Sequence, residues 1–310
     1  MDCAVTHVTR FQYRGPVHES VMELRFAPSN VRQQVEAFEL ETNPAATLFE
    51  YVDQYGNHVH HFDIVEPHDE LTIEARMRVR TFPERVLPER LEPSAWQTLE
   101  RLQADGQLWD FLEPSPRVPI SAAVRAFANA HGIARAADPL TCIRGIVNTV
   151  HQALVYAPDS TTVDTPVETV LETRRGVCQD FAHVCLALAR AHRIPCRYVS
   201  GYLVPTGQQA ESTNLASHAW VEAWLPDLEW TAFDPTHNLV AGERHISVAV
   251  GRDYADAAPT HGVFRGGPAG TLWVSVRIEP AGGIPSTARE WSMAPVVSPA
   301  PTPTSAQQDQ

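Results

Sequence analysis

The chain has no lysine, and all 24 of its basic residues are arginine. We attribute this to a GC-rich genome, which the many alanine, arginine and proline residues also indicate. Positive charge is scarce as well, because 37 acidic residues give a formal net charge of -13. This charge argues against nucleic acid as a partner, since phosphates call for a basic surface. It also argues against docking on an anionic membrane.

Long hydrophobic runs are missing too. The longest apolar stretch, Val184–Ala189, is far too short to cross a bilayer. Residues 1–13 lack the apolar core flanked by positive charge that marks a signal peptide. The five cysteines are an odd number and do not have the spacing of a disulfide framework: Cys3, Cys142, Cys178, Cys185 and Cys196. We therefore expect a bacterial cytoplasmic protein with reduced thiols.

The pattern of residues divides the 310-residue chain into four parts. Residues 1–82 alternate apolar and polar side chains and predict an antiparallel β-sandwich-like domain. The proline-rich start of residues 83–118 predicts a linker followed by a helical segment. Residues 119–280 predict helices packed on an antiparallel sheet, and the Pro/Ala/Ser-rich residues 281–310 predict a disordered tail. The predicted fold class is α+β.

One predicted helix begins with a cysteine. Cys178, Phe181, Cys185 and Leu188 lie three and four positions apart, so they share one face of a helix that runs to about residue 192. A thiol in the first helical turn feels the positive end of the helix dipole, which favours the thiolate. A free cysteine, with a pKa of about 8.5, is mostly protonated at neutral pH, so a nucleophilic thiol also needs a neighbouring base.

Two predicted strands supply a base and a carboxylate. Ser217–Leu225 and Glu229–Asp234 are separated by a tight connection, which predicts an antiparallel pair. His218 and Asp234 are 16 positions apart and their midpoint falls on that connection, so we expect them to be direct cross-strand neighbours. With Cys178 they form a predicted catalytic triad, in which the carboxylate holds the imidazole in the tautomer that takes the thiol proton.

The three residues lie in short motifs: Gly-Val-Cys-Gln-Asp-Phe-Ala (176–182), Ser-His-Ala-Trp-Val-Glu (217–222) and Phe-Asp-Pro-Thr-His-Asn (233–238). Together these motifs resemble the bacterial transglutaminase-like superfamily, a branch of the papain-like thiol enzymes. Residues 53–57 and 251–254 are similar to that family's N-terminal β-rich domain and to its closing segment. The resemblance implies a papain-like catalytic core in residues 119–280. It also implies that Cys178 is the nucleophile, His218 the base and Asp234 the orienting acid.

The implied reaction is a two-step acyl transfer on a peptide, a protein or a small amide. Cys178 attacks an amide carbonyl, His218 protonates the departing amine, and a thioester remains. The backbone N–H of Cys178 is a candidate oxyanion donor, and Gln179 is a second candidate for which the sequence predicts no geometry.

Three functions are compatible with these residues. We favour hydrolysis, as by a cysteine protease or amidase. The second is a transglutaminase that passes the acyl group to an amine, in which case a chain without lysine could not offer its own side chains as acceptors. The third is a non-catalytic binding module that has kept a papain-like core. No feature of the sequence specifies an oligomeric state.

Other polar residues are interpreted as structural. Five residues could be considered as zinc ligands: Cys178, His183, Cys185, His192 and Cys196. They include no Cys-x-x-Cys pair, which is the spacing typical of a zinc site. We therefore predict no metal and no cofactor. We expect Asp180 and Glu222 to anchor loops, and His237 to shape the turn after Asp234.

Overall fold

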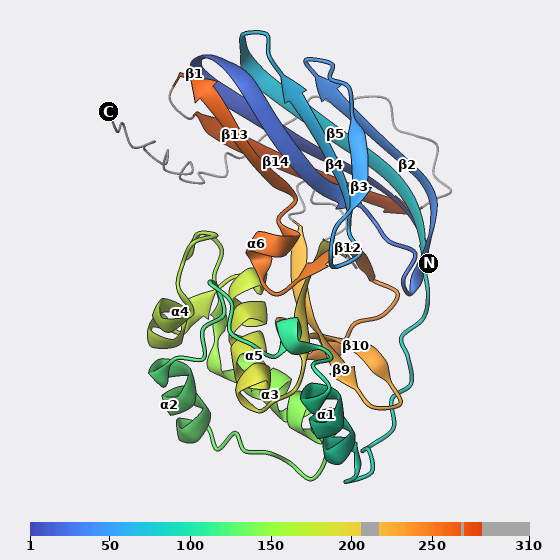
Figure 1. The fold of residues 1–310 in the computed structure, drawn as a ribbon, viewed down its shortest axis with the longest axis vertical. Coiled ribbons are helices and arrows are strands. Elements are labelled where there is room, and N and C mark those ends of the chain that lie inside the picture. The colour runs from blue at the N-terminus through green and yellow to red at the C-terminus, as the bar shows by residue number, and fades with distance from the viewer. Residues whose placement is uncertain (206–216, 268–269, 281–310) are drawn as a thin grey trace.

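The computed structural model describes residues 1–205, 217–267 and 270–280, and the tail predicted for residues 281–310 lies outside them. A β domain stands on a second domain of helices and sheet (Figure 1). The strands are β1 (Asp2–Ala27), β2 (Gln33–Asn43), β3 (Phe49–Val52), β4 (His58–Ile64), β5 (His68–Thr81), β6 (Val155–Tyr156), β7 (Arg175–Gly176), β8 (Cys196–Leu203), β9 (His218–Leu225), β10 (Glu229–Asp234), β11 (Leu239–Val240), β12 (His245–Gly251), β13 (Thr260–Gly266) and β14 (Thr271–Pro280). The helices are α1 (Ala95–Ala104), a 3-10 turn (Trp109–Phe111), α2 (Ala122–Ala130), α3 (Pro139–Ala153), α4 (Val167–Thr173), α5 (Cys178–Ala191) and α6 (Tyr254–Ala257).

The long strand β1 is the centre of the first sheet. Its first half, Asp2–Gln12, pairs with β5 and β14, and the residues from Val17 onward pair chiefly with β4 and β13. All of these pairings are antiparallel, as the alternating pattern predicts. Leu24, Phe62 and Ile73 belong to the apolar core that these strands enclose.

Two late strands join this first sheet rather than the second domain. The sequence prediction assigned all of residues 119–280 to the catalytic core, but β13 and β14 pair along β1. Val276 is fully buried in the apolar core of the first sheet. Alternation shows which face of a strand is buried but does not identify its partner, which lies more than 250 positions away in the chain.

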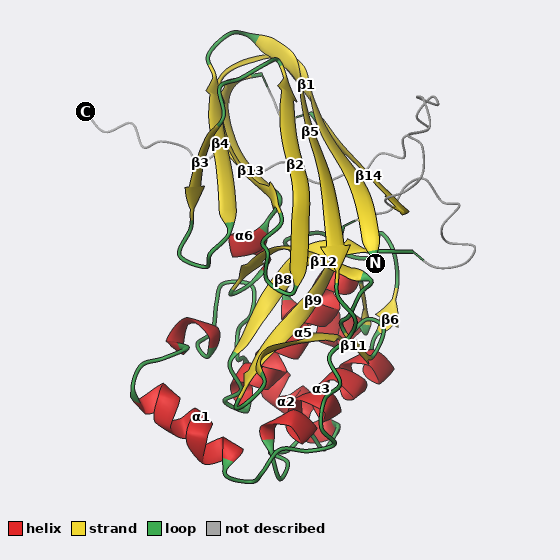
Figure 2. Ribbon diagram, turned by 90° about the vertical axis from the view of Figure 1, so that its right-hand side faces the viewer, coloured by secondary structure: helices red, strands yellow, loops and turns green. Residues whose placement is uncertain are grey.

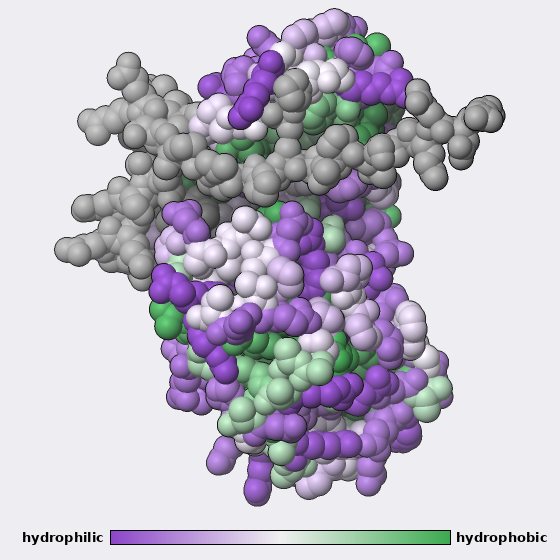
Figure 3. Space-filling view, turned by 90° about the vertical axis from the view of Figure 1, so that its left-hand side faces the viewer, coloured by the Kyte–Doolittle hydropathy of each residue, from purple (hydrophilic) through white to green (hydrophobic). Residues whose placement is uncertain are grey.

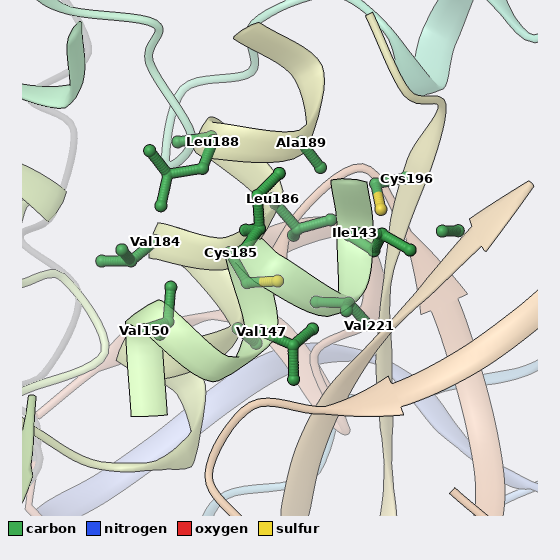
Figure 4. Close-up of a cluster of buried hydrophobic side chains, with 14 of the residues drawn as sticks. Ile143, Val147, Val150, Val184, Cys185, Leu186, Leu188, Ala189, Cys196 and Val221 are labelled. Atoms are coloured by element: carbon green, nitrogen blue, oxygen red, sulfur yellow. The ribbon is translucent and has the colours of Figure 1, made fainter. Parts of the chain in front are cut away.

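The second domain is built around α5. A five-stranded sheet in the order β11-β10-β9-β8-β12 packs against this helix, and α3 packs beside α5 and also contacts β9. Residues 179–190 are all buried, as expected for a helix covered on every side. Figure 4 shows Ile143 and Val147 of α3 beside Cys185 of α5 and Val221 of β9. This packing holds the first residues of α5 and β9, Cys178 and His218, on one rigid core.

The first domain closes the free edge of the second sheet. Strand β12 ends the strand order of that sheet, which leaves backbone groups available on its outer side. The Gln33 amide donates to the Ser247 carbonyl (2.6 Å) and accepts from the Ser247 N–H (3.0 Å). Asn57 does the same with Val250, at 2.7 and 2.8 Å. Each side-chain amide therefore replaces one residue of a missing neighbouring strand.

The helices gather around the second sheet, and the short α6 lies at the junction with the first (Figure 2). Over the helical half, polar and apolar residues are interspersed on the face shown in Figure 3. Within the described part of the chain, every helix is too short or too polar to span a membrane.

Candidate active site

Cys178 is the first residue of α5 and is partly exposed. The turn before it is held by Asp180, whose Oδ2 accepts hydrogen bonds from the Val177 N–H (2.7 Å) and the Thr161 hydroxyl (2.6 Å). A Cβ at Gly176 would lie 2.7 Å from Asp180 Cβ, so only glycine fits there. Burial raises the pKa of Asp180, although the bonds from Thr161 and Val177 oppose that effect. Asp180 thus anchors the turn that presents the thiol.

His218 begins β9 and Asp234 ends β10, its antiparallel neighbour. Val221 pairs with Phe233, so the register places Asp234 opposite Trp220 rather than opposite His218. The expectation of direct cross-strand neighbours is therefore wrong by two positions. A shift of two keeps both side chains on one face, because strand faces alternate with period two. His218 Nε2 consequently lies 2.8 Å from Asp234 Oδ2.

The His218 ring also interacts with the Cys178 sulfur, and this interaction raises the pKa of the ring. Because Nε2 is directed at Asp234, Nδ1 is the ring nitrogen left for the sulfur. Burial lowers the pKa of His218, but the interactions with Asp234 and Cys178 outweigh burial and raise that pKa to about 10. The structure therefore brings together the three residues predicted from sequence, and it places the imidazole between the thiol and the carboxylate.

Asp234 is fully buried and receives more hydrogen bonds than the sequence predicts. Its Oδ1 accepts the backbone N–H groups of Thr236 (2.9 Å) and His237 (3.2 Å). Its Oδ2 contacts three imidazoles: those of His218 (2.8 Å), His237 (2.8 Å) and His245 (3.1 Å). Burial raises the pKa of Asp234, yet the bonds from these imidazoles hold it well below the ordinary range. The carboxylate is therefore ionised and fixed at both oxygens.

Sequence reasoning missed His245 and underestimated His237. The expected turn role of His237 is present in its backbone bond to Asp234, but its ring adds a second contact. His245 begins β12, which reaches the site only because β12 pairs with β8. No motif or spacing around His245 indicates this placement, since the contact depends on strand order.

Trp220 lies across the imidazoles. Its ring is stacked on His218 at 6.0 Å between centroids and stands edge-on to His245 at 5.1 Å. A Cβ at Gly201 on β8 would lie 2.6 Å from the Trp220 ring and 2.1 Å from the Ile246 carbonyl oxygen. The indole can therefore occupy this position only because residue 201 has no side chain. On the same strand as Trp220, Glu222 forms a bond of 2.6 Å with Arg197, which gives Glu222 an anchoring role.

One group of side chains has metal-ligand chemistry within the described residues: His218, Asp234 and His245. Its hydrogen bonds do not fit an ion. The Gly242 N–H points at His245 Nδ1 (3.3 Å), so Nδ1 is an acceptor and the ring proton sits on Nε2. A metal on Nε2 would need the opposite tautomer. The zinc ligands considered from the sequence do not fit an ion either. Cys185 and Cys196 are fully buried, and burial raises the pKa of each thiol, which disfavours the thiolate that a metal binds.

Known families match both domains of the chain. The transglutaminase-like superfamily model matches residues 128–235, and the bacterial transglutaminase-like N-terminal region matches residues 3–80. An uncharacterized protein of Mycobacterium leprae is 37% identical over 284 residues, which are 88% of this chain and 97% of that protein. The protein-glutamine gamma-glutamyltransferase of Pseudomonas aeruginosa is 36% identical over 100 residues, which are 30% of this chain and 15% of that protein. The solved structure of a candidate cysteine protease from Cytophaga hutchinsonii has a TM-score of 0.69 and 21% identity, and covers 94% of this chain and 93% of that chain.

The fold and the site define an α+β protein of the papain-like class, with a cysteine at the start of the central helix and a His–Asp pair on the sheet. The chain belongs to the transglutaminase-like superfamily. Members of this superfamily are typically cysteine-dependent enzymes, and all three residues of the site lie inside the region that the superfamily model matches.

Proposed function

We propose that the protein is a thiol enzyme that hydrolyses an amide or peptide bond by acyl transfer through Cys178. The observation that carries the proposal is the position of His218, whose ring interacts with the Cys178 sulfur and has its Nε2 2.8 Å from Asp234 Oδ2. Because the pKa of His218 is raised to about 10, the ring is in its doubly protonated, cationic form throughout the neutral range. It therefore has a proton to give to a leaving group. The expected substrates are peptides, proteins or small amides.

In the proposed first step the thiol proton of Cys178 passes to His218, the sulfur bonds to the amide carbonyl carbon, and an electron pair of the C=O bond moves to the carbonyl oxygen. That pair re-forms the C=O bond in the next step. The C–N bond then breaks, His218 gives its proton to the departing amine, and a thioester remains. Water attacks the thioester while His218 takes the proton of the water molecule. The C–S bond breaks, and the acid leaves. Throughout, Asp234 keeps the proton on His218 Nε2, so that Nδ1 serves the sulfur.

The developing oxyanion needs donors at the start of α5. Backbone N–H groups in the first turn of a helix have no partner within the helix, so the Cys178 amide is the proposed donor. Gln179, the other candidate from sequence, donates from Nε2 to the Val163 carbonyl at 3.1 Å. That contact supports a structural role for Gln179.

The alternative is transfer of the acyl group to an amine. It is favoured by the 100-residue similarity to the protein-glutamine gamma-glutamyltransferase of Pseudomonas aeruginosa. The first step is the same for both functions, so the acceptor distinguishes them. Nothing among the contacts of Cys178, His218 and Asp234 selects an amine over water.

The deciding experiment incubates the protein with a library of glutamine-containing peptides and a labelled primary amine. Peptide cleavage or ammonia release in excess of amine incorporation supports hydrolysis, and incorporation in excess of both supports the alternative. Cys178→Ala is the control and should form neither product. Equal product with Cys178→Ala would refute both functions, because both need the thiol.

We also propose that the protein works in a reducing compartment, the cytoplasm. All five cysteines are free thiols, including the partly exposed Cys178. Cell fractionation with an antibody tests this, and recovery outside the cytoplasmic fraction would contradict it.

A further inference from the structure

His245 is a buried histidine that acts on the site from a third strand. Its side chain is 5% exposed, and its Nε2 lies 3.1 Å from Asp234 Oδ2. On the opposite edge of the ring, Nδ1 accepts the Gly242 N–H at 3.3 Å. A neutral imidazole has one donor and one acceptor nitrogen, so a donor facing Nδ1 places the proton on Nε2. The ring therefore donates to the carboxylate that in turn holds His218.

We propose that His245 is a positioning residue, whose Nε2–H keeps the Asp234 carboxylate ionised and oriented toward His218. The inference rests on the proposed function, since it concerns how the proposed base is held. In this role His245 acts through Asp234, although its ring also lies 6.0 Å from the His218 ring, measured between centroids.

The surroundings of Asp234 distinguish His245 from the other imidazoles. The groups that face this carboxylate are His218 from β9, His237 from the turn after β10, and His245 from β12, with Arg244 next to His245 in the chain. The His237 side chain is 44% exposed, so water can replace it when it is removed. His245 is enclosed, and its loss leaves a buried carboxylate oxygen without that donor.

The ring of His245 stays neutral and in place. Burial lowers its pKa, and this effect exceeds the opposing influence of Asp234, so the ring remains a neutral donor at neutral pH. Trp220 stands edge-on to it at 5.1 Å. The strand that carries it is closed on its outer edge by Gln33 and Asn57 of the first domain. The β domain thus contributes to the site by holding the strand on which His245 lies.

The test measures alkylation of Cys178 by iodoacetamide, mapped by mass spectrometry, at pH 5.5 and pH 9 on the full chain. His245→Phe keeps an aromatic ring against Trp220 but removes the donor, whereas His245→Gln keeps an N–H near the position of Nε2. We expect His245→Phe to react about tenfold to a hundredfold more slowly than wild type at pH 5.5. At pH 9 we expect rates within about threefold, because a free thiol ionises there without help. His245→Gln should recover most of the loss at pH 5.5.

His237→Phe is the comparison variant and should lose less than His245→Phe, because its position is open to water. Equal rates for wild type and His245→Phe at both pH values would overturn the inference, and so would a His245→Gln variant as slow as His245→Phe. A second measurement needs no variant: nitrogen-15 NMR of labelled histidine in the wild-type protein should show His245 neutral with its proton on Nε2. The Nδ1–H tautomer would overturn the inference even if His245→Phe does not fold.

The positioning role of His245 and the proposed hydrolysis can fail independently of each other. If wild type turns over no amide while Cys178 alkylation still depends on His218 and His245, the proposed hydrolysis fails and the positioning role stands. If turnover is observed and the alkylation rate is indifferent to His245, the reverse holds.

Discussion

His218 and Asp234 form a 2.8 Å hydrogen bond although they stand two positions out of register on β9 and β10. The bond is therefore diagonal, and its geometry depends on how the carboxylate is turned. The turn after β10 sets this orientation, because the backbone N–H groups of Thr236 and His237 both bind Asp234 Oδ1. One carboxylate oxygen is thus held by the turn, and the other serves the imidazoles.

This division of labour makes Asp234→Asn an informative substitution. The amide keeps a carbonyl oxygen for the turn but loses the charge that holds His218. We expect kcat/KM on any substrate found to fall by about a thousandfold or more, as when a triad carboxylate is neutralised. Asp138→Asn is a matched control, because Asp138 is a buried carboxylate that caps α3 far from the site in the chain. The control should lower stability and leave kcat/KM near wild type. An Asp234→Asn variant within tenfold of wild type would contradict the account.

The raised pKa of His218 predicts a pH dependence of stability. A histidine whose pKa is higher in the folded than in the unfolded state stabilises the fold fully below its ordinary pKa of about 6.5. That contribution is lost as the pH rises through the folded value of about 10. We compare the free energy of unfolding in guanidinium chloride for wild type and His218→Gln at pH 6 and pH 10.5. The advantage of wild type should shrink at the higher pH, and an advantage that is constant or grows would refute the prediction.

Gly201→Ala tests the packing behind the site. The added Cβ would lie 2.1 Å from the Ile246 carbonyl oxygen and 2.6 Å from the Trp220 ring. We expect the free energy of unfolding to fall by about 1–3 kcal/mol or more, and the alkylation of Cys178 at pH 5.5 to slow as Trp220 shifts. Gly145→Ala is the control, since a Cβ there meets nothing within 4 Å on helix α3. It should leave alkylation unchanged and stabilise the fold by up to about 1 kcal/mol. A stable, fully reactive Gly201→Ala would contradict the packing argument.

Gln33→Ala tests the contact between the domains. Its removal leaves the Ser247 N–H and carbonyl on β12 without their partner, which should cost about 1–3 kcal/mol. Hydrogen exchange at the Ser247 amide should accelerate. Gln34→Ala, at the neighbouring exposed position, should change neither the free energy of unfolding nor that exchange rate. Unaltered exchange in Gln33→Ala would show that the Gln33 side chain does not hold this part of β12.

Local features of the site could be read from the sequence, and distant ones could not. Spacings of three and four placed Cys178 in the first turn of a helix, and α5 begins at that residue. The strands that carry His218 and Asp234 were also predicted within one residue. Their register was not, because a three-residue turn with positive φ at Asp227 moves the centre of the hairpin by one position. A register shift of an even number of residues leaves each side chain on the same face of the sheet. His218 and Asp234 therefore still lie close enough to form a hydrogen bond.

His245 and the late strands show where sequence reasoning ends. His245 reaches Asp234 through the pairing of β12 with β8, and β13 and β14 return to β1 from the far end of the described chain. Alternation of apolar residues marks each of these segments as a strand, but it carries no information about partners. Both results depend on the order of strands in a sheet, which is decided by contacts between distant parts of the chain.

Trapping the acyl intermediate tests whether Cys178 is the nucleophile and His218 its base. The full chain is mixed with an activated ester such as a p-nitrophenyl ester, quenched in acid, and mapped by mass spectrometry. We expect the acyl group on Cys178, no adduct in Cys178→Ala, and acylation at least about a hundredfold slower in His218→Ala. Acyl transfer to another residue, or a His218→Ala variant acylated at the wild-type rate, would contradict the account.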